Sequence, residues 1–337
     1  MKKYLIIAVL MVAAIGIGVF WRRARQPQEP SKVWRIGILQ RGVSYDPGIA
    51  GYKERMAELG YREGQNVVYD FRLVQTKEEM TKAAEELVAT GSDLMLTWST
   101  PATQAAYAAT KDLAVPIPIV FGSMGDPLAT GLVKSIQRPG TNVTGVASLS
   151  TELTEKRIEL LKKVNPMIQR IAMPHTERAA GDVAANKSVD IAQEAAKKFG
   201  VTLLLYPLKS NQEYARVAQT LTAEGAEGII VGGDSLVWGG IDTFAKHAIA
   251  KKLPLAAFDL SHIQKGALIG FGPDYRVTGA QAAGLTHQIL RGGDPAQISV
   301  EVPQKLMLIV NLDTARSIGI TLSEELLQQA DVVVGSR

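Results

Sequence analysis

Short apolar runs alternate with amphipathic stretches from Val33 onward. The first run, Val33–Leu39, predicts a buried strand, and Gly48–Leu59 has the spacing of a helix. Further strands are predicted at 67–74, 93–98, 117–121 and 143–147, with helices at 77–89, 101–113 and 127–136. Strands that alternate with helices at this rhythm predict βαβ units, and therefore a parallel sheet covered by helices on both faces.

The same rhythm restarts after residue 150 and ends in a shorter tail. Helices are predicted at 152–164, 182–199, 211–223, 236–251, 276–290, near Thr314 and at 324–329. Strands are predicted at 170–173, 201–206, 228–231, 255–258, 267–272, 298–302 and 306–310. A chain of 337 residues suits two lobes, and the tail has too few elements for a third.

We therefore expect the tail to complete both lobes by crossing between them more than once. The expected first lobe is residues 33–148 plus about 262–297, and the second is 149–261 plus about 298–337. Two Rossmann-like α/β lobes with parallel sheets, joined by several crossings, form a hinged cleft. Ligands of such sheets bind beyond the carboxyl ends of the strands, so polar residues at strand ends are the candidates for a site.

Positive charge is concentrated at the N-terminus. The formal net charge of +4 includes five Lys and Arg residues within residues 1–25, which hold no acid, so it falls to −1 for residues 26–337. This nearly neutral body gives no indication of nucleic-acid binding. Lys2-Lys3 precede an uncharged run from Tyr4 to Trp21, and Arg22-Arg23 follow it. As a helix, the run is about 27 Å long, close to the hydrocarbon thickness of a bilayer.

We predict that residues 4–21 are an uncleaved signal-anchor, with a cleaved signal peptide within residues 1–25 as the alternative. A clear A-x-A cleavage site is missing, and arginines follow the apolar run directly. Residues 26–32, with two prolines, read as a linker. The body is expected in the periplasm, or otherwise outside the cytoplasm, tethered to the inner membrane. Positive charge at both ends of the run leaves its orientation open.

The sequence lacks the residues and motifs that several kinds of active site and metal site require. There is no cysteine, which excludes disulfides, thiolate metal sites and a lipidated cysteine. There is also no G-x-G-x-x-G after the first strand, no P-loop, no H-E-x-x-H and no G-x-S-x-G. The four histidines are dispersed without ligand spacing: His175, His247, His262 and His287. We expect no cofactor and no metal, and the spacing gives no support to a triad of Ser99, His175 and Asp234.

Two strand ends in the first half are each followed by a capped helix start. In "TWSTPATQAA" (97–106), Thr100 suits an N-cap and Pro101 the first turn. Together with Ser99 they offer hydroxyls and free backbone N–H groups to a carboxylate. In "FGSMGDP" (121–127), Ser123 and Asp126 offer a hydroxyl and a carboxylate to a ligand ammonium. A helix cap alone is the alternative at both places. A carboxylate site and an ammonium site together would suit an α-amino acid.

Two segments of the second half add further candidates. "VGGDSLVWGG" (231–240) places Asp234 and Ser235 opposite the first lobe, with a capping Asp in a Gly-rich loop as the alternative. "GFGPDYRVTG" (270–279) places Asp274 and Tyr275 near a predicted crossing, as hinge or ligand groups or as a helix start. Three aromatic residues can form apolar walls for a ligand or belong to the core: Trp98, Phe121 and Trp238.

An ordered set of motifs between about Val33 and Val333 is similar to a known family. The motifs are "STPATQAA", "GDPLATGLV", "PGTNVTGV", "GFGPDYRVTGAQAA", "QILRGGDPAQISVEVP" and "VNLDTARSIGITLSEELLQQAD". The set resembles the ABC transporter substrate-binding protein family that includes tryptophan- and tyrosine-binding members. The resemblance implies a type I periplasmic-binding-protein fold, a closing cleft, partner permease and ATPase subunits, and no catalysis. A monomer is expected.

The resemblance also implies roles for particular residues. The "STPA" segment lines the ligand site in this family, which implies contacts from Ser99 and Thr100, and the "DP" segment adds Asp126. At a position where relatives have an Asp-Asn pair, this chain has Asp234 and Ser235. The "DY" pair at 274–275 implies a contact on the side of the hinge.

We therefore expect the substrate-binding component of an ABC importer. It would hold a small solute in the interlobe cleft, an amino acid or a similar compound, with aromatic amino acids among the choices. Two alternatives stay open from the sequence. The same cleft can serve a sensor that signals to a membrane kinase or cyclase, and Ser99 can serve a hydrolase.

Overall fold

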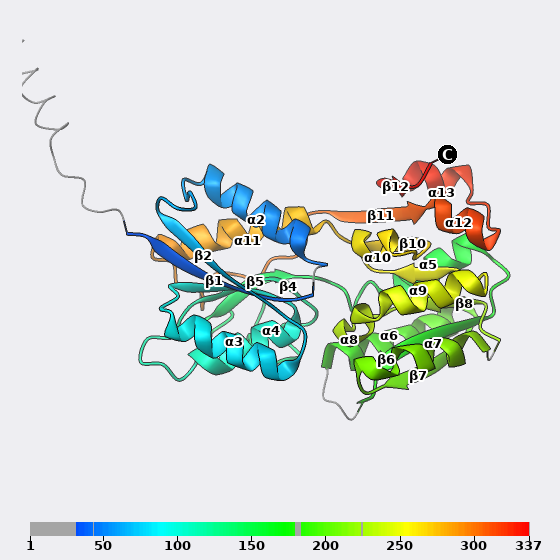
Figure 1. Ribbon diagram of the computed structural model, residues 1–337, viewed down its shortest axis with the longest axis horizontal. Coiled ribbons are helices and arrows are strands. Elements are labelled where there is room, and N and C mark those ends of the chain that lie inside the picture. Colours follow the sequence, from blue (N-terminus) through cyan, green and yellow to red (C-terminus); the bar gives the residue numbers. More distant parts are fainter. Residues whose placement is uncertain (1–31, 43, 179–182, 224, 337) are drawn as a thin grey trace, which may run out of the picture.

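The computed structural model describes residues 32–42, 44–178, 183–223 and 225–336, and it has two α/β lobes (Figure 1). The first lobe is built on a five-stranded parallel sheet in the order β2-β1-β3-β4-β5. Its strands are β1 (Trp34–Arg41), β2 (Val67–Val74), β3 (Leu94–Trp98), β4 (Ile119–Met124) and β5 (Val143–Ala147). Its helices are α2 (Asp46–Glu58), α3 (Lys77–Ala89), α4 (Thr100–Thr110) and α11 (Tyr275–Leu290).

The second lobe is built on a seven-stranded sheet in the order β12-β11-β10-β9-β8-β6-β7, in which only the β10–β11 pairing is antiparallel. Its strands are β6 (Arg170–Thr176), β7 (Thr202–Leu208), β8 (Gly228–Ile230), β9 (Leu255–Ala257), β10 (Ile269–Pro273), β11 (Leu306–Asn311) and β12 (Val332–Val334). Its helices are α5 (Thr154–Val164), α6 (Val183–Phe199), η2 (Asn211–Glu213), α7 (Tyr214–Ala223), α8 (Ser235–Gly239), α9 (Ile241–Ala250), α10 (Leu260–Gln264), α12 (Leu312–Ile318) and α13 (Glu324–Gln329).

The chain passes between the lobes three times within the described residues, after β5, between β10 and α11, and just before β11. The last two crossings come later than the expected divisions near 262 and 298. Strand β10 pairs with β9 and β11, so the second lobe continues to Pro273. Residues 298–302 stay in the first lobe, because Glu301 exchanges backbone hydrogen bonds of 2.9 Å with Gly145 and Ala147 of β5.

Two predicted helices differ from the structure for reasons of local backbone geometry. The segment 127–136 forms turns, because Gly131 takes a φ of +71° directly after the first turn. The segment 236–251 is divided into α8 and α9 at Gly240. A Cβ on Gly240 would lie 2.7 Å from the ring of Tyr214, so this position accepts only glycine where the two helices meet.

The tail helix α11 packs against α2 on the first lobe (Figure 1). Glycines bring the two backbones together, since a Cβ on Gly51 would lie 2.1 Å from the Arg276 carbonyl oxygen, and one on Gly279 would lie 2.0 Å from that of Gly48. The Tyr52 hydroxyl donates to Thr286 Oγ1 at 3.1 Å across the same contact. The first lobe is therefore completed by a helix that follows most of the second lobe in the sequence.

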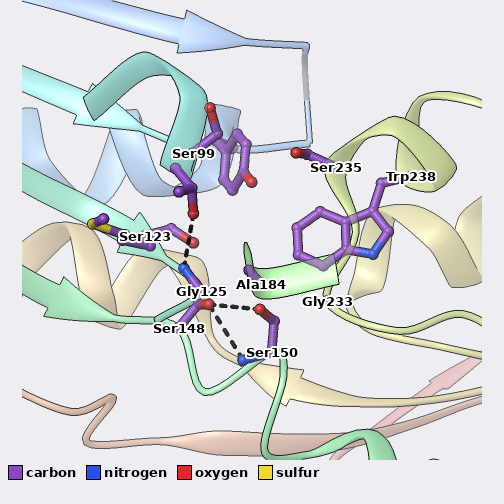
Figure 2. A pocket seen from close by; sticks show the side chains of 12 residues that line it. Ser99, Ser123, Gly125, Ser148, Ser150, Ala184, Gly233, Ser235 and Trp238 are labelled. Atoms are coloured by element: carbon purple, nitrogen blue, oxygen red, sulfur yellow. Dashed lines mark hydrogen bonds between the residues drawn. The ribbon is translucent and has the colours of Figure 1, made fainter. Parts of the chain in front are cut away.

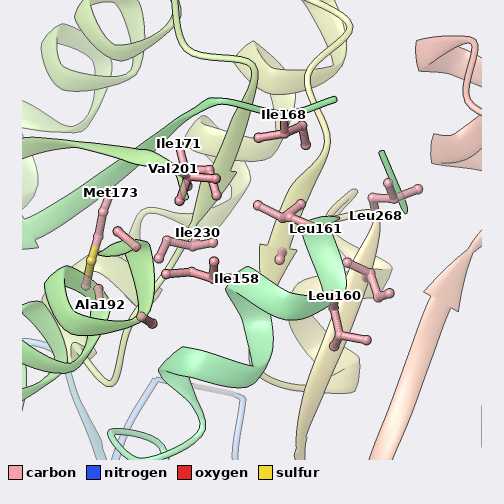
Figure 3. Packing of buried hydrophobic residues seen from close by; sticks show 14 of the residues in the cluster. Ile158, Leu160, Leu161, Ile168, Ile171, Met173, Ala192, Val201, Ile230 and Leu268 are labelled. Atoms are coloured by element: carbon pink, nitrogen blue, oxygen red, sulfur yellow. The ribbon is translucent and has the colours of Figure 1, made fainter. Parts of the chain in front are cut away.

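In the second lobe, an apolar cluster fills the space between helix α5 and the sheet (Figure 3). Ile158 and Leu161 of α5 are fully buried against Ile171 of β6 and Ile230 of β8. This packing fixes the strands whose carboxyl ends face the first lobe. No helix of the described residues is long and apolar enough to cross a membrane, and the predicted span at 4–21 lies outside them.

Candidate functional site

A cavity lies between the lobes, beyond the carboxyl ends of strands from both sheets (Figure 2). Its walls are formed by Tyr45, Ser99, Thr100, Ser123, Met124, Gly125, Ser148, Ser150, Ala184, Gly233, Ser235 and Trp238. Serine and threonine hydroxyls dominate these walls, and no charged side chain belongs to them. The volume open to the centre of a water molecule is about 20 Å³, which is room for about one water. A larger solute therefore enters only when the lobes move apart.

Ser99 joins β3 to α4 in a backbone conformation that favours glycine, with φ 100° and ψ 152°. Such a conformation costs a residue with a side chain about 1–3 kcal/mol. Ser99 Oγ accepts from the Ala102 N–H at 3.3 Å, so Ser99 is the N-cap, where the sequence pattern predicted Thr100. Because Pro101 has no N–H and that of Ala102 is already bound, the helix start offers an anion fewer free donors than expected.

Hydroxyl side chains connect the strand ends of the first lobe. Thr100 Oγ1 accepts from the Gly125 N–H at 3.2 Å, which joins the start of α4 to the residue after β4. On the crossing after β5, Ser148 Oγ lies 3.0 Å from Ser150 Oγ and accepts from the Ser150 N–H at 3.3 Å (Figure 2). Neither serine was a candidate from the sequence, although both follow the predicted strand 143–147 and ligands of parallel sheets bind beyond strand ends.

Trp238 is the aromatic wall contributed by the second lobe (Figure 2). Its Nε1 donates to the Gly232 carbonyl oxygen at 2.7 Å, and its ring stacks on Phe258 with centroids 4.9 Å apart. Gly233 lies beside it, where a Cβ would be 2.8 Å from Ser150 Oγ. At the mouth, Ser235 Oγ accepts from the guanidinium of Arg41, across the cleft, at 3.5 Å.

Aromatic rings of the first lobe and of the crossing between β10 and α11 pack together next to the cavity. The Tyr45 centroid lies 5.1 Å from that of Tyr275 and 5.6 Å from that of Trp98. Burial raises the pKa of the Tyr45 phenol, which stays neutral at pH 7. Of the three aromatic candidates, Trp238 borders the cavity, whereas Trp98 and Phe121 are fully buried core residues.

Asp126 does not border the cavity, because it is bound to a lysine of the second lobe. Lys187 Nζ lies 2.5 Å from Asp126 Oδ2, and the Asp126 side chain is only 8% exposed. Burial raises the pKa of Asp126, but the bonds from Lys187 and from the Ala129 N–H outweigh it and lower the pKa on balance. The bond to Asp126 in turn raises the pKa of Lys187. The cation that Asp126 holds is therefore the protein's own, not a ligand ammonium as the sequence suggested.

Asp234 is fully buried and directed into its own lobe. Its carboxylate accepts from the N–H and hydroxyl of Thr176 at 2.6 and 2.8 Å, and from the N–H groups of Leu236 and Val237 at 3.0 and 3.2 Å. All four donors come from its own lobe, so this carboxylate is held away from the first lobe. His175 bonds through Nδ1 to the Thr176 carbonyl oxygen at 2.8 Å, and this bond does not join it to Asp234.

Asp274 and Tyr275 lie on the crossing between β10 and α11, outside the cavity wall. Asp274 caps α11 by accepting from two N–H groups of its first turn, and it pairs with Lys305 of the neighbouring crossing at 3.1 Å. Asp274 thus ties together two of the segments that connect the lobes. Tyr275 is 4% exposed and belongs to the aromatic layer behind the cavity.

Two α/β lobes joined by three crossings around a polar cavity define a two-lobed solute-binding protein. A family model described as "ABC transporter substrate binding protein" matches residues 38–334, and the chain belongs to this family. Its members are solute-binding proteins rather than enzymes, and they work outside the cytoplasm with a permease and an ATPase. The expected type I periplasmic-binding-protein architecture is confirmed by the two sheets and by solved structures of that fold.

Relatives with known ligands support the same class. A tyrosine-binding protein of Clostridioides difficile (strain R20291) is 29% identical over 293 residues, covering 86% of this chain and 82% of that protein. An ABC domain from Streptococcus pneumonia in complex with L-Trp is 27% identical with a TM-score of 0.82, covering 90% of this chain and 100% of that chain. The ligand-free, open structure of a substrate-binding protein with adhesive properties from Clostridium difficile is 28% identical with a TM-score of 0.66 over the same shares. At nearly equal identities, the overall structure is more similar to that of the tryptophan complex than to that of the open, ligand-free protein.

Proposed function

We propose that this chain binds an aromatic α-amino acid between its lobes and delivers it to an ABC importer. The observation that supports this ligand class is the pair of rings at the cavity, Tyr45 from the first lobe and Trp238 from the second, around walls of hydroxyl groups. Aromatic rings on both sides suit an aromatic side chain, which gains from stacking or edge contacts as well as from burial. The relatives that bind tyrosine and tryptophan support the same choice.

We infer that the polar contacts come from Ser99, Thr100, Ser123 and Ser235, the four candidates of the sequence analysis that border the cavity. Ser99 is open to a test that separates binding from stability. Ser99→Gly removes the hydroxyl and the cap but relieves the unfavourable φ, so we expect unfolding free energy to change by less than about 1 kcal/mol. Loss of one ligand hydrogen bond should weaken binding of L-tyrosine about tenfold. Unchanged binding in this variant would remove Ser99 from the site.

Trp238 provides a direct measurement of ligand binding. Titration of the full-length chain with L-tyrosine should change the tryptophan emission and raise the melting temperature. Trp238→Phe should lose most of the emission change, whereas Trp34→Phe, whose indole lies at the start of β1, should keep it. Calorimetry with L-tyrosine, L-tryptophan and L-phenylalanine then ranks the ligands. No heat and no thermal shift with any of the three would overturn the proposed ligand class.

We further propose that residues 4–21 tether the protein to the membrane and that it acts as a monomer. The uncharged run between two basic pairs supports the tether. Full-length chain should sediment with membranes, whereas a variant without residues 1–25 should be released. Light scattering should give the mass of one copy, 36.3 kDa, for uncleaved chain after correction for detergent.

A further inference from the structure

We propose that the carboxylate of Asp259 receives the ammonium group of the bound amino acid, a role that rests on the proposed function. Asp259 directly follows β9, next to the end of β8 in the sheet, and is 2% exposed. Its Oδ1 accepts from the Ser261 hydroxyl at 2.6 Å and from the His262 N–H at 3.1 Å. Its Oδ2 has no hydrogen-bond partner among the described residues. A buried carboxylate oxygen without a donor is costly, and a ligand donor would remove that cost.

Two basic groups near Asp259 do not supply this donor. His262 Nε2 lies 4.0 Å from Oδ2, beyond hydrogen-bond length, and burial lowers the pKa of His262, which keeps the imidazole neutral at pH 7. Arg157 donates instead to the carbonyl oxygens of Val231 and Ser150, each at 3.0 Å. Burial lowers the pKa of Arg157 to about 9, against the opposing effect of Asp259. Arg157 therefore stays a cation that offsets the charge of Asp259 without bonding to it.

Asp259 does not border the cavity, but its charge acts on Tyr45, which does, and helps raise the pKa of that phenol after burial. Trp238, which borders the cavity, packs on Phe258 and approaches the His262 ring edge-on at 5.7 Å, so it covers the segment that holds Asp259. On the other side, the buried Tyr275 hydroxyl lies near Tyr45 and Ser123, and the charge of Asp259 helps raise the pKa of this phenol, after burial and Tyr45. Tyr45 belongs to the first lobe, so separation of the lobes uncovers this side of the second lobe.

Three other acids near the cavity are already bound. Asp126 pairs with Lys187, and Asp234 accepts four hydrogen bonds within its lobe. Asp46 accepts from the side-chain amide of Gln40 at 2.7 Å. Within the described part of the chain, Asp259 Oδ2 is the carboxylate oxygen that is both buried and without a partner. This difference selects Asp259 over the acids that the sequence pattern favoured.

The test compares two ligands that differ only in the ammonium group. L-tyrosine and 3-(4-hydroxyphenyl)propionate are titrated into the full-length chain by calorimetry. Wild type should prefer L-tyrosine by about 100-fold, since the deaminated acid leaves Asp259 unpaired. Asp259→Asn keeps the shape and the helix cap but loses the charge. This variant should lose most of that preference by weakening L-tyrosine binding, with binding of the deaminated acid changed less than about threefold.

Asp126→Asn is the matched control, because it removes a carboxylate from the cleft that is bound to Lys187. It should weaken both ligands by the same factor and keep the preference. Circular dichroism checks the fold of each variant. Equal binding of the two ligands by wild type would overturn the role of Asp259 without any variant, and so would a preference that survives in Asp259→Asn. Failure of wild type to bind any aromatic amino acid would instead overturn the proposed function.

Discussion

Asp126 and Asp234 follow the same Gly-Asp pattern at a strand end, one in each lobe, and they do different things. Asp126 reaches across the cleft and binds Lys187 of α6, whose side chain is 44% exposed. Asp234 accepts all of its hydrogen bonds within the second lobe and is fully buried. The partner, not the motif, decides whether such a residue stabilises one lobe or holds two lobes together. Variants of each should therefore separate folding stability from lobe closure.

The largest effect is expected from Asp234→Ala. The change leaves four donors without their acceptor, three of them buried, including both of Thr176, so we expect a loss of about 3–5 kcal/mol in the free energy of unfolding. Urea denaturation monitors it. Asp190→Ala is the control, because Asp190 pairs with Arg178 at an exposed position and should change stability by less than about 0.5 kcal/mol. Equal losses in the two variants would show that burial of Asp234 is not what matters.

A smaller effect, on binding rather than folding, is expected from Lys187→Met. Lys187 is the exposed partner of this ion pair and is screened by solvent. The free energy of unfolding should therefore fall by less than about 1 kcal/mol. The lost contact exists only when the lobes are close, and we expect L-tyrosine affinity to fall about fivefold. Lys198→Met, on the same helix, removes a pair with Glu155 inside the second lobe and should leave affinity unchanged. If both variants bind equally well, the pair does not favour closure.

The pH dependence of this contribution follows from the two pKa shifts. The pKa of Asp126 is lowered from 3.8, so the contribution is fully present above pH 3.8 and is lost as pH falls through the folded-state pKa. The pKa of Lys187 is raised from 10.5, so the contribution is lost only as pH rises through that higher value. The affinity ratio of wild type to Lys187→Met should be constant between about pH 5 and pH 9. A ratio that changes within this range would implicate a different titrating group.

The smallest effect is expected from Arg41→Gln. The bond from Arg41 to Ser235 also crosses the cleft, but at 3.5 Å it is long, and the mouth is open to solvent. We expect less than a twofold change in L-tyrosine affinity, measured by calorimetry at low and high salt. A change as large as that of Lys187→Met would show that the mouth holds the lobes together as firmly as Asp126 does.

Part of the candidate site could be predicted from the sequence with the rule that ligands bind beyond the carboxyl ends of parallel strands. This rule located Ser99, Thr100, Ser123 and Ser235 on the cavity, because Ser123 lies near the carboxyl end of β4 and the other three directly follow a strand or open the next helix. The order of strands and helices likewise identified both lobes, since the apolar runs report which faces are buried.

The rest depended on partners that lie far away in the sequence. Lys187 is 61 residues from Asp126, and Thr176 is 58 residues from Asp234, so no local pattern shows that these carboxylates are already bound. Asp259 is the reverse case. No local sequence pattern singles it out, and only the folded structure shows an oxygen that its neighbours fail to reach.

The three crossings have a consequence for the order in which the protein is made. The first lobe lacks α11 and residues 298–302 until the last part of the chain is synthesised, and the sheet of the second lobe lacks β11 and β12. Neither lobe can therefore finish folding while the chain is still emerging from the ribosome. Because members of this family work outside the cytoplasm, we expect both lobes to stay incomplete during translocation until β11 and β12 have been made.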